Sequence, residues 1–561
     1  MPNDQPNPPF ADRCLYPRLN SEGGLIYNPV LTHCSRTDPV DIVIGKVRAL
    51  PIVFVPGIMG SNLKVKGGVD GKEFKVWTVD SKAGIALQQL GKSAGDRQRL
   101  MHPDRTEVDP GGAVPRQPIG VLRNEAHFRQ RGWGEVSAVS YQNMLIWLEE
   151  HFNGQRGSGI GHSSHEVINA TLRSLVDRNG WEAQKPFEPL TQAESSKAEA
   201  WQYPVYVCGY NWLASNEVAA TRLASRVDAI IEANNSVFGD CEQVIVVTHS
   251  MGGLVARRCA QLPGMDQKIA GVVHGVMPAI GASVAYRRCK IGMWDEDAAT
   301  SLVIGRTGKE ITAVFAQSPG ALELLPTSQY TREWLQIYGD TNPADWMETA
   351  ARNPYQELYQ ERIKWWGPVK EAWLSPQDGK PIDWEVYIRA LGEAAKFHAA
   401  IKNSYHPNTW AFYGRAVPTF DRVTWRYEVD RRMDLSSQPL MTPEEVRNIP
   451  YDQAHLNGTH LEYLDGPPVQ RMNPQLLARL NYPSTYVLRL TPPEGEGDGT
   501  VPVSSGRAPL QFVRQLFAVP GLGHEPAYQS VEAQQITAYA IAKIASMATC
   551  TFDKPAIGAR Q

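Results

Sequence analysis

The chain has 561 residues, of which 42% are hydrophobic and 20% charged, and its formal net charge is −3. Because it lacks a basic surplus, this composition gives no reason to expect nucleic acid as a partner or electrostatic attachment to an anionic membrane. Residues 1–13 are polar and rich in proline, whereas a general signal peptide has a cationic start and an apolar run, and no later window is apolar enough to span a bilayer. We therefore expect a soluble protein, made in the cytoplasm without a general signal peptide and with no transmembrane segment.

Four short apolar runs predict the strands of a parallel sheet. They cover residues 50–57, 203–210, 242–250 and 269–278, and they lack the alternation of a sheet with one wet face. Helical patterns lie between them, and Ser215 can cap a helix whose apolar face carries Val218, Leu223, Val227, Ile230 and Ile231. Strands that alternate with helices predict an α/β fold with a mostly parallel, doubly wound sheet.

Two regions interrupt this alternation. Residues from about 66 to 200 are polar and rich in glycine, with one strong helical pattern at 141–152. Residues 281–405 are helical in pattern, and seven of the 15 tryptophans fall between Trp294 and Trp384. These features predict a helical, tryptophan-rich cap, or lid, packed over the sheet.

The strand patterns resume after the predicted cap. Residues 409–419 and 511–519 are β-rich, and residues 531–545 have the pattern of a final helix. A strand pattern at 485–490 lies inside a further insertion. We therefore expect three parts: the first part of the core at 1–280 with an insertion at about 66–200, the cap at 281–405, and the second part of the core at 406–561 with an insertion at about 420–497.

The seven cysteines are scattered, without the C-x-x-C spacing of many metal and redox sites. We expect most of them to be buried reduced thiols, and one bridge between Cys14 and Cys34 stays open. We expect neither a metal ion nor a cofactor.

Ser250 stands between a strand pattern and the start of a helix, in the stretch VIVVTHSMGGLVARR. A serine nucleophile on such a strand-to-helix turn needs small neighbours, because the backbone must pass close to other segments. Gly252 and Gly253 meet this need after the serine, and Thr248 stands two positions before it, where the G-x-S-x-G motif has glycine. The context predicts a nucleophile; the alternative is a serine in an ordinary glycine turn.

A serine nucleophile also requires two N–H donors for the oxyanion that forms when it attacks a carbonyl. One is expected from the residue after the nucleophile, Met251, and the other from the loop after the first apolar strand. That loop, VPGIMGSN, offers the N–H groups of Ile58 and Met59. The sequence leaves open which of the two is the second donor.

The acid and the base are expected on loops after later strands, in that order along the chain. Asp498 lies between two glycines, and His524 lies between a strand pattern and the final helix. Asp498 could also be a turn residue, or form a calcium loop with Glu494 and Glu496, although calcium needs six or more oxygen ligands in a register that this stretch does not show. We predict that Asp498 orients His524 and that His524 is the base.

Thirteen histidines compete for the role of base. His249 is next to Ser250, but adjacent side chains on a tight turn point apart, and His274, at the end of a strand, is expected to form a local hydrogen bond. Only His524 occupies the expected loop; the others considered belong to the cap or an insertion, namely His398, His406, His455 and His460.

Four motifs in this order, PGIMGSNL, THSMGGL, FYGRAVPT and GDGTVP, resemble the lecithin:cholesterol acyltransferase-like branch of the α/β-hydrolases and the related PGAP1-like lipases. SPGALELLP also resembles the proline-rich cap segment of that family. The resemblance implies an α/β-hydrolase with cap insertions, a triad of Ser250, Asp498 and His524, and activity on acyl esters of lipids. One departure is the segment 211–213, Asn-Trp-Leu, where the family often has Asp-Trp-Arg.

With several insertions and no general signal peptide, the predicted lipase is similar to antibacterial phospholipase effectors delivered by type VI secretion. This similarity implies a lipid substrate at a membrane surface, an immunity protein as inhibitor and a secretion-apparatus carrier. The sequence therefore predicts a serine esterase that hydrolyses acyl esters of membrane phospholipids. The alternatives are an acyltransferase that moves the acyl chain to an alcohol, and a non-catalytic binding module with a hydrolase fold. The tryptophans of the cap either shield an acyl chain or form the core of the cap.

Overall fold

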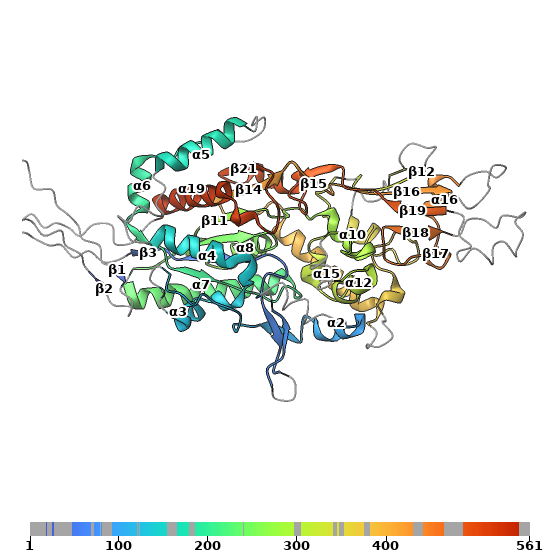
Figure 1. The fold of residues 1–561 in the computed structure, drawn as a ribbon, viewed down its shortest axis with the longest axis horizontal. Helices are drawn as coiled ribbons and strands as arrows, with labels where there is room; N and C mark the ends of the chain where they lie inside the picture. The colour runs from blue at the N-terminus through green and yellow to red at the C-terminus, as the bar shows by residue number, and fades with distance from the viewer. Residues whose placement is uncertain are drawn as a thin grey trace, which may run out of the picture.

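The computed structural model describes most of the chain between residues 48 and 548, and two short strands before it. The described residues are 18–19, 25–26, 48–68, 72–78, 80, 92–119, 122, 124–153, 165–178, 186–238, 240–296, 305–331, 333–339, 345–346, 353–374, 382–429, 441–464 and 486–548. Figure 1 shows a central sheet in one half of the molecule and a second sheet at the far end of the other half.

The central sheet has six strands, and every neighbouring pair in it is parallel. This agrees with the predicted doubly wound α/β fold. Because all six strands are parallel, their carboxyl ends lie at one edge of the sheet. Strands are added on both sides of β10. In sheet order the strands are β21 (Gln515–Pro520), β14 (Thr409–Arg415), β11 (Ile269–Gly275), β10 (Val244–His249), β4 (Ile52–Val55) and β9 (Val205–Val207).

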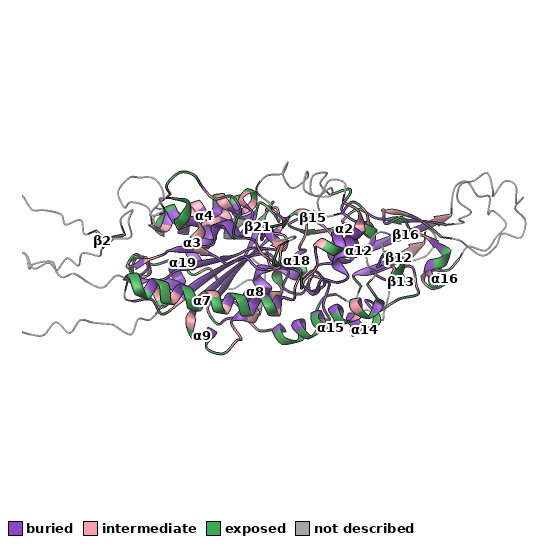
Figure 2. Cartoon of the chain, turned by 90° about the horizontal axis from the view of Figure 1, so that it is seen from below, coloured by how far each residue is buried: buried purple, intermediate pink, exposed green. Residues whose placement is uncertain are grey.

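Both faces of the central sheet are buried, which explains why its strands lack polar alternation. In β10, Ile245 and Val247 belong to one hydrophobic core, while Val244 and Val246 belong to the other. Figure 2 shows the buried strands between two layers of helices. One layer contains α7 (Asn216–Phe238) and α8 (Gly252–Cys259), and the other contains α4 (Ala138–Asn153) and α19 (Val531–Met547).

The helix predicted after Ser215 is α7, and the Ser215 hydroxyl accepts a hydrogen bond from the N–H of Glu217 at 3.2 Å. Leu223, Val227 and Ile230 are buried against the sheet, as predicted. Val218 is an exception, because it is 60% exposed. At 3.6 residues per turn Val218 lies on the side of α7 opposite Leu223 and Val227, while Ala219 and Ala220 of the same turn are buried, so Val218 does not belong to the apolar face.

The first insertion holds more regular structure than the single helix that its sequence indicated. A three-stranded sheet is formed by β6 (Lys75–Trp77), β5 (Leu63–Val65) and β7 (Thr106–Val108). The insertion also contains three short helices with polar N-caps, which leave little periodic signal, and one longer helix. The short ones are α2 (Ala94–Leu100), α3 (Glu125–Gln130) and α6 (Gln192–Ala198), and the longer one is α5 (His165–Arg178).

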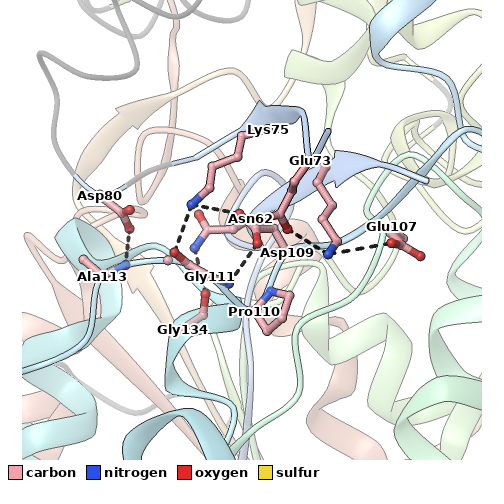
Figure 3. Close-up of polar contacts among 12 residues, drawn as sticks. Asn62, Glu73, Lys75, Asp80, Glu107, Asp109, Pro110, Gly111, Ala113 and Gly134 are labelled. Carbon is pink, nitrogen blue, oxygen red and sulfur yellow. Dashed lines mark hydrogen bonds and ion pairs between the residues drawn. The ribbon is translucent and has the colours of Figure 1, made fainter. Parts of the chain in front are cut away.

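Asn62 attaches this insertion to the core directly behind the loop after β4. Its side-chain NH₂ group donates to the carbonyls of Gly134 at 3.1 Å and Val136 at 3.2 Å, and its backbone carbonyl accepts from the N–H of Asp109 at 2.8 Å. Figure 3 shows Asn62 between Gly134 and Asp109, with Lys75 beside the Asp109 carboxylate at 3.4 Å. The insertion therefore buttresses a loop that the sequence assigned to the active site.

The chain leaves the central sheet after β11 and returns at β14, and the segment between them builds the cap. As expected, the cap contains helices, among them α10 (Ser283–Ile291), α12 (Gly308–Phe315) and α15 (Trp384–Ile401). It also contains a second sheet, which the helical pattern did not predict. This sheet joins the cap to the insertion after residue 420, because β12 (Leu335–Gly339) pairs in parallel with β16 (Val423–Val429).

The second sheet continues from β16 through strands of the later insertion, and its other pairs are antiparallel. They include β19 (Tyr486–Leu490), which matches the predicted strand at 485–490. Most of the cap tryptophans lie in the core between this sheet and the helices, so they stabilise the cap itself. The buried ones are Trp334, Trp365, Trp366, Trp373 and Trp384, whereas Trp294 is 40% exposed.

No helix in the described part of the chain is both long and apolar enough to cross a membrane. The four cysteines within the described residues are buried free thiols, as expected for most of the seven: Cys208, Cys241, Cys259 and Cys289. Cys14 and Cys34, for which a bridge was left open, lie outside the described residues, as does Cys550.

Candidate active site

Ser250 occupies the turn between β10 and α8. Its φ angle is 51°, a left-handed conformation that is uncommon for serine and costs on the order of 1–3 kcal/mol. The turn is held from below, because the Ser250 N–H donates to the Gly275 carbonyl of the neighbouring strand at 2.9 Å. This geometry raises the side chain above the carboxyl edge of the sheet.

The residues around Ser250 are small because other segments pass within contact distance. A Cβ atom on Gly252 would lie 2.5 Å from the carbonyl oxygen of Val55, and one on Gly253 would lie 2.5 Å from the sulfur of Met277. Thr248 replaces the usual glycine and is fully buried. Its hydroxyl lies 2.9 Å from Nδ1 of His274, so the extra polar group has a hydrogen-bond partner.

The structure brings together the three side chains predicted to form a triad. His524 Nε2 lies 2.9 Å from Ser250 Oγ, and His524 Nδ1 lies 2.8 Å from Asp498 Oδ2. His524 follows β21, and Asp498 follows the short strand β20 (Gly495–Gly497). Residues separated by up to 274 positions therefore form one hydrogen-bonded series at the carboxyl edge of the sheet.

Asp498 uses its two carboxylate oxygens for two purposes. Oδ1 accepts the N–H groups of Thr500 at 2.9 Å and Val501 at 2.6 Å, as a turn aspartate does. Oδ2 faces His524, whose N–H also donates to the Asp498 carbonyl at 2.9 Å. The turn interpretation and the orienting interpretation of Asp498 therefore describe the same geometry.

The calcium alternative finds no support in this loop. The side chain of Glu496 is 58% exposed and lies 3.8 Å from Arg415, away from the bonds that Asp498 makes. Within the described residues, no group of three or more histidine, cysteine, aspartate or glutamate side chains is arranged to hold a metal ion.

The loop after β4 forms a tight turn beside the serine. The Gly60 N–H donates to the Gly57 carbonyl at 3.1 Å, and Met59 has a φ angle of 62°. The turn touches the nucleophile, because a Cβ atom on Gly57 would lie 3.0 Å from the Cβ of Ser250. Among the described residues, the N–H groups of Ile58, Met59 and Met251 have no hydrogen-bond partner. All three are therefore unoccupied donors, which is what an oxyanion site requires.

His249 makes contacts that its sequence position did not predict. Its ring is buried, and both ring nitrogens have partners: Nε2 lies 2.8 Å from the backbone carbonyl of His524 and Nδ1 lies 3.0 Å from the hydroxyl of Tyr141. Burial and, to a smaller extent, the positive charge of a protonated His524 lower the pKa of His249 to about 3. His249 is therefore neutral at ordinary pH.

The remaining histidines that were considered have other partners. His398 bonds to Tyr355 through Nδ1, His406 Nδ1 accepts the N–H of Asn408 at 3.2 Å, and His460 packs against Trp294. His455 lies in β17 (Ala454–His455), a strand of the later insertion.

The segment at 211–213 serves the packing of the first insertion. The side-chain amide of Asn211 donates to the carbonyls of Pro103 at 2.8 Å and Thr106 at 3.1 Å. Trp212 is buried and meets the ring of Trp77 edge to face. The side chain of Asn211 therefore bonds to the protein's own backbone.

The chain matches no family model, and no curated protein matches it. A chain in the crystal structure of the Tle4–Tli4 complex is similar in structure, with a TM-score of 0.69 and 28% sequence identity. The match covers 90% of this chain and 100% of that chain, so it includes the cap as well as the core. The predicted fold class, an α/β-hydrolase with cap insertions, is confirmed.

Proposed function

We propose that this chain is a serine hydrolase that cleaves acyl esters of membrane phospholipids. The observation that carries the proposal is the hydrogen-bonded series from Ser250 through His524 to Asp498, beside the unoccupied N–H donors of the β4 loop. This arrangement provides a nucleophile, a base, an orienting carboxylate and an oxyanion site, which are the four parts that acyl transfer through serine requires.

In the proposed mechanism, Ser250 Oγ attacks the acyl carbonyl while His524 Nε2 accepts the hydroxyl proton. Asp498 holds the imidazole with Nε2 toward the serine and stabilises the imidazolium that forms. The oxyanion is bound by the N–H of Met251 and by that of Ile58 or Met59. His524 then gives the proton to the departing alcohol, and water, activated by the same base, releases the fatty acid and restores Ser250.

Lipid as the substrate, and type VI secretion as the route, are supported by the motif resemblance and by the likeness to the solved Tle4–Tli4 complex. We assign the chain to the lecithin:cholesterol acyltransferase-like and PGAP1-like branch on the same motifs. Because the similar solved chain is part of a complex, we also propose an immunity protein as an inhibitory partner, together with a secretion-apparatus carrier.

The hydrolase proposal is tested with purified wild type, Ser250→Ala and the control Ser225→Ala. Ser225 is an exposed serine on α7, where its hydroxyl donates to the Thr221 carbonyl. We expect wild type and Ser225→Ala to hydrolyse p-nitrophenyl butyrate and to react with a fluorophosphonate probe, and Ser250→Ala to do neither. Activity that survives in Ser250→Ala would contradict the proposed nucleophile.

The substrate class is tested with phospholipid vesicles and mass spectrometry of the products. Free fatty acid and lysophospholipid are expected from wild type, whereas transfer of the acyl chain to an added sterol would identify an acyltransferase. Wild type directed to the periplasm of a Gram-negative host should stop growth, and Ser250→Ala should not. Equal growth of the two strains, with equal amounts of protein, would contradict the effector role.

A further inference from the structure

Two buried side chains outside the proposed mechanism connect the oxyanion loop to the base. The N–H of Gly57 donates to the hydroxyl oxygen of Tyr141 at 3.1 Å, and that oxygen lies 3.0 Å from His249 Nδ1. His249 Nε2 in turn lies 2.8 Å from the backbone carbonyl of His524. Tyr141 comes from α4 and His249 from β10, so four separate segments meet in one series of hydrogen bonds.

The two ends of this series determine the direction of every bond in it. A backbone carbonyl only accepts, so His249 Nε2 must carry the hydrogen that it donates to His524. The neutral ring then has a bare Nδ1, which accepts the hydroxyl hydrogen of Tyr141. The oxygen of Tyr141 remains free to accept from Gly57, whose N–H only donates. Burial keeps His249 neutral, which preserves this arrangement.

Packing around Tyr141 and His249 makes the same connection without hydrogen bonds. A Cβ atom on Gly60 would lie 2.7 Å from the Tyr141 hydroxyl, and one on Gly57 would lie 2.9 Å from His249 Nδ1. The Gly57–Gly60 turn therefore rests directly on these two side chains. Because Tyr141 occupies the N–H of Gly57, the turn leaves only the following N–H groups, those of Ile58 and Met59, for an oxyanion.

We propose that Tyr141 and His249 are positioning residues that hold the oxyanion turn and the His524 loop at a fixed separation across Ser250. The inference rests on the proposed function, because it concerns the geometry of the same site. Neither side chain bonds to a reacting atom. Their effect is on distances, and oxyanion donors and a general base act only when held within about 0.5 Å of the productive geometry.

Tyr141→Phe tests the inference, with Tyr355→Phe as a matched control. Both tyrosines are buried, and both hydroxyls bond to Nδ1 of a histidine, but Tyr355 and its partner His398 lie in the cap. We expect Tyr141→Phe to lower kcat for p-nitrophenyl butyrate about 10- to 100-fold, less than the loss of a whole oxyanion donor, with KM changed less than about 3-fold. Tyr355→Phe should keep kcat within about 2-fold of wild type, with a similar shift in Tm.

His249 supplies a second test through a conservative replacement. Gln can still donate an N–H toward the His524 carbonyl, whereas Phe fills the space and donates nothing. The kcat of His249→Gln should therefore be at least about 5-fold higher than the kcat of His249→Phe. The comparison applies when the two variants have equal Tm. Equal rates for the two variants would overturn the inference for His249.

The outcomes separate this inference from the proposed function. If wild type hydrolyses the ester and Ser250→Ala does not, but Tyr141→Phe matches Tyr355→Phe in kcat, the positioning role is wrong and the hydrolase proposal stands. If Ser250→Ala remains active, the proposed function itself fails.

Discussion

Asp498→Asn should nearly abolish hydrolysis while leaving the fold intact. The asparagine oxygen can still accept the N–H groups of Thr500 and Val501, which now bond to Oδ1 at 2.9 and 2.6 Å. The amide NH₂ would then face His524 Nδ1, which lies 2.8 Å from Oδ2. Since that NH₂ donates, Nδ1 would become the acceptor and the ring hydrogen would move to Nε2.

A hydrogen on Nε2 faces Ser250 Oγ at 2.9 Å and prevents His524 from accepting the hydroxyl proton. The loss of the correct tautomer in serine hydrolases lowers kcat by about 10⁴-fold, which corresponds to about 5 kcal/mol of transition-state stabilisation. The residual rate would come from the oxyanion donors and substrate binding, neither of which the substitution touches.

The loss of activity in Asp498→Asn is measured by steady-state hydrolysis of p-nitrophenyl butyrate and by the rate of fluorophosphonate labelling. Thermal unfolding shows whether the variant is folded. Asp228→Asn is the control, because Asp228 is a half-exposed aspartate that pairs with Lys268 on the surface. We expect the control to match wild type in all three measurements. A folded Asp498→Asn protein with kcat within about 10-fold of wild type would refute the role given to Asp498.

Three further predictions concern packing and pH. In Gly57→Ala the new methyl group would lie 3.0 Å from the Cβ of Ser250, so we expect kcat to fall at least about 10-fold; an unchanged rate would mean that the turn can move freely. Burial raises the pKa of Glu323 to about 8, so the folded chain holds this proton between pH 4.5 and 8 and the stability from this group is lost as pH rises; the Tm of wild type minus the Tm of Glu323→Gln should therefore decrease between pH 5 and 8, and a constant difference would disprove this. Burial lowers the pKa values of three histidines, His249, His274 and His398, to about 3. Below pH 6.5 the unfolded chain therefore binds more protons than the folded chain, and the urea concentration at the midpoint of unfolding should decrease from pH 7 to pH 5. A constant midpoint would contradict this prediction.

The elements that were predicted correctly have local causes. The buried strand β10, the turn at Ser250 and the helix after it follow from a run of β-branched residues and two glycines within 15 positions. The second sheet could not be predicted in this way. A strand as short as β12, with five residues, leaves no periodic signal, and its partner β16 is supplied by a segment almost 90 residues later.

In the candidate site, too, features set by nearby residues were predicted, and contacts between distant segments were not. The positions of Asp498 and His524 were predicted because each follows a strand in a required order, which a single sequence can reveal. Tyr141 was missed because a tyrosine on the apolar side of a helix is usually a core residue, and its partner His249 is 108 positions away. His249 was expected only to point away from Ser250; its bond to the His524 backbone depends on a loop that arrives 275 residues later.

The long separation between Ser250 and His524 has a consequence for the time course of translation. A ribosome reaches the serine codon 274 codons before the histidine codon, and the cap is synthesised in between. For the proposed enzyme, a nascent chain that ends before His524 cannot hydrolyse an ester, however well its earlier strands have folded. A nonsense or frameshift mutation upstream of the His524 codon would therefore yield a polypeptide that lacks the proposed base and is inactive as an esterase.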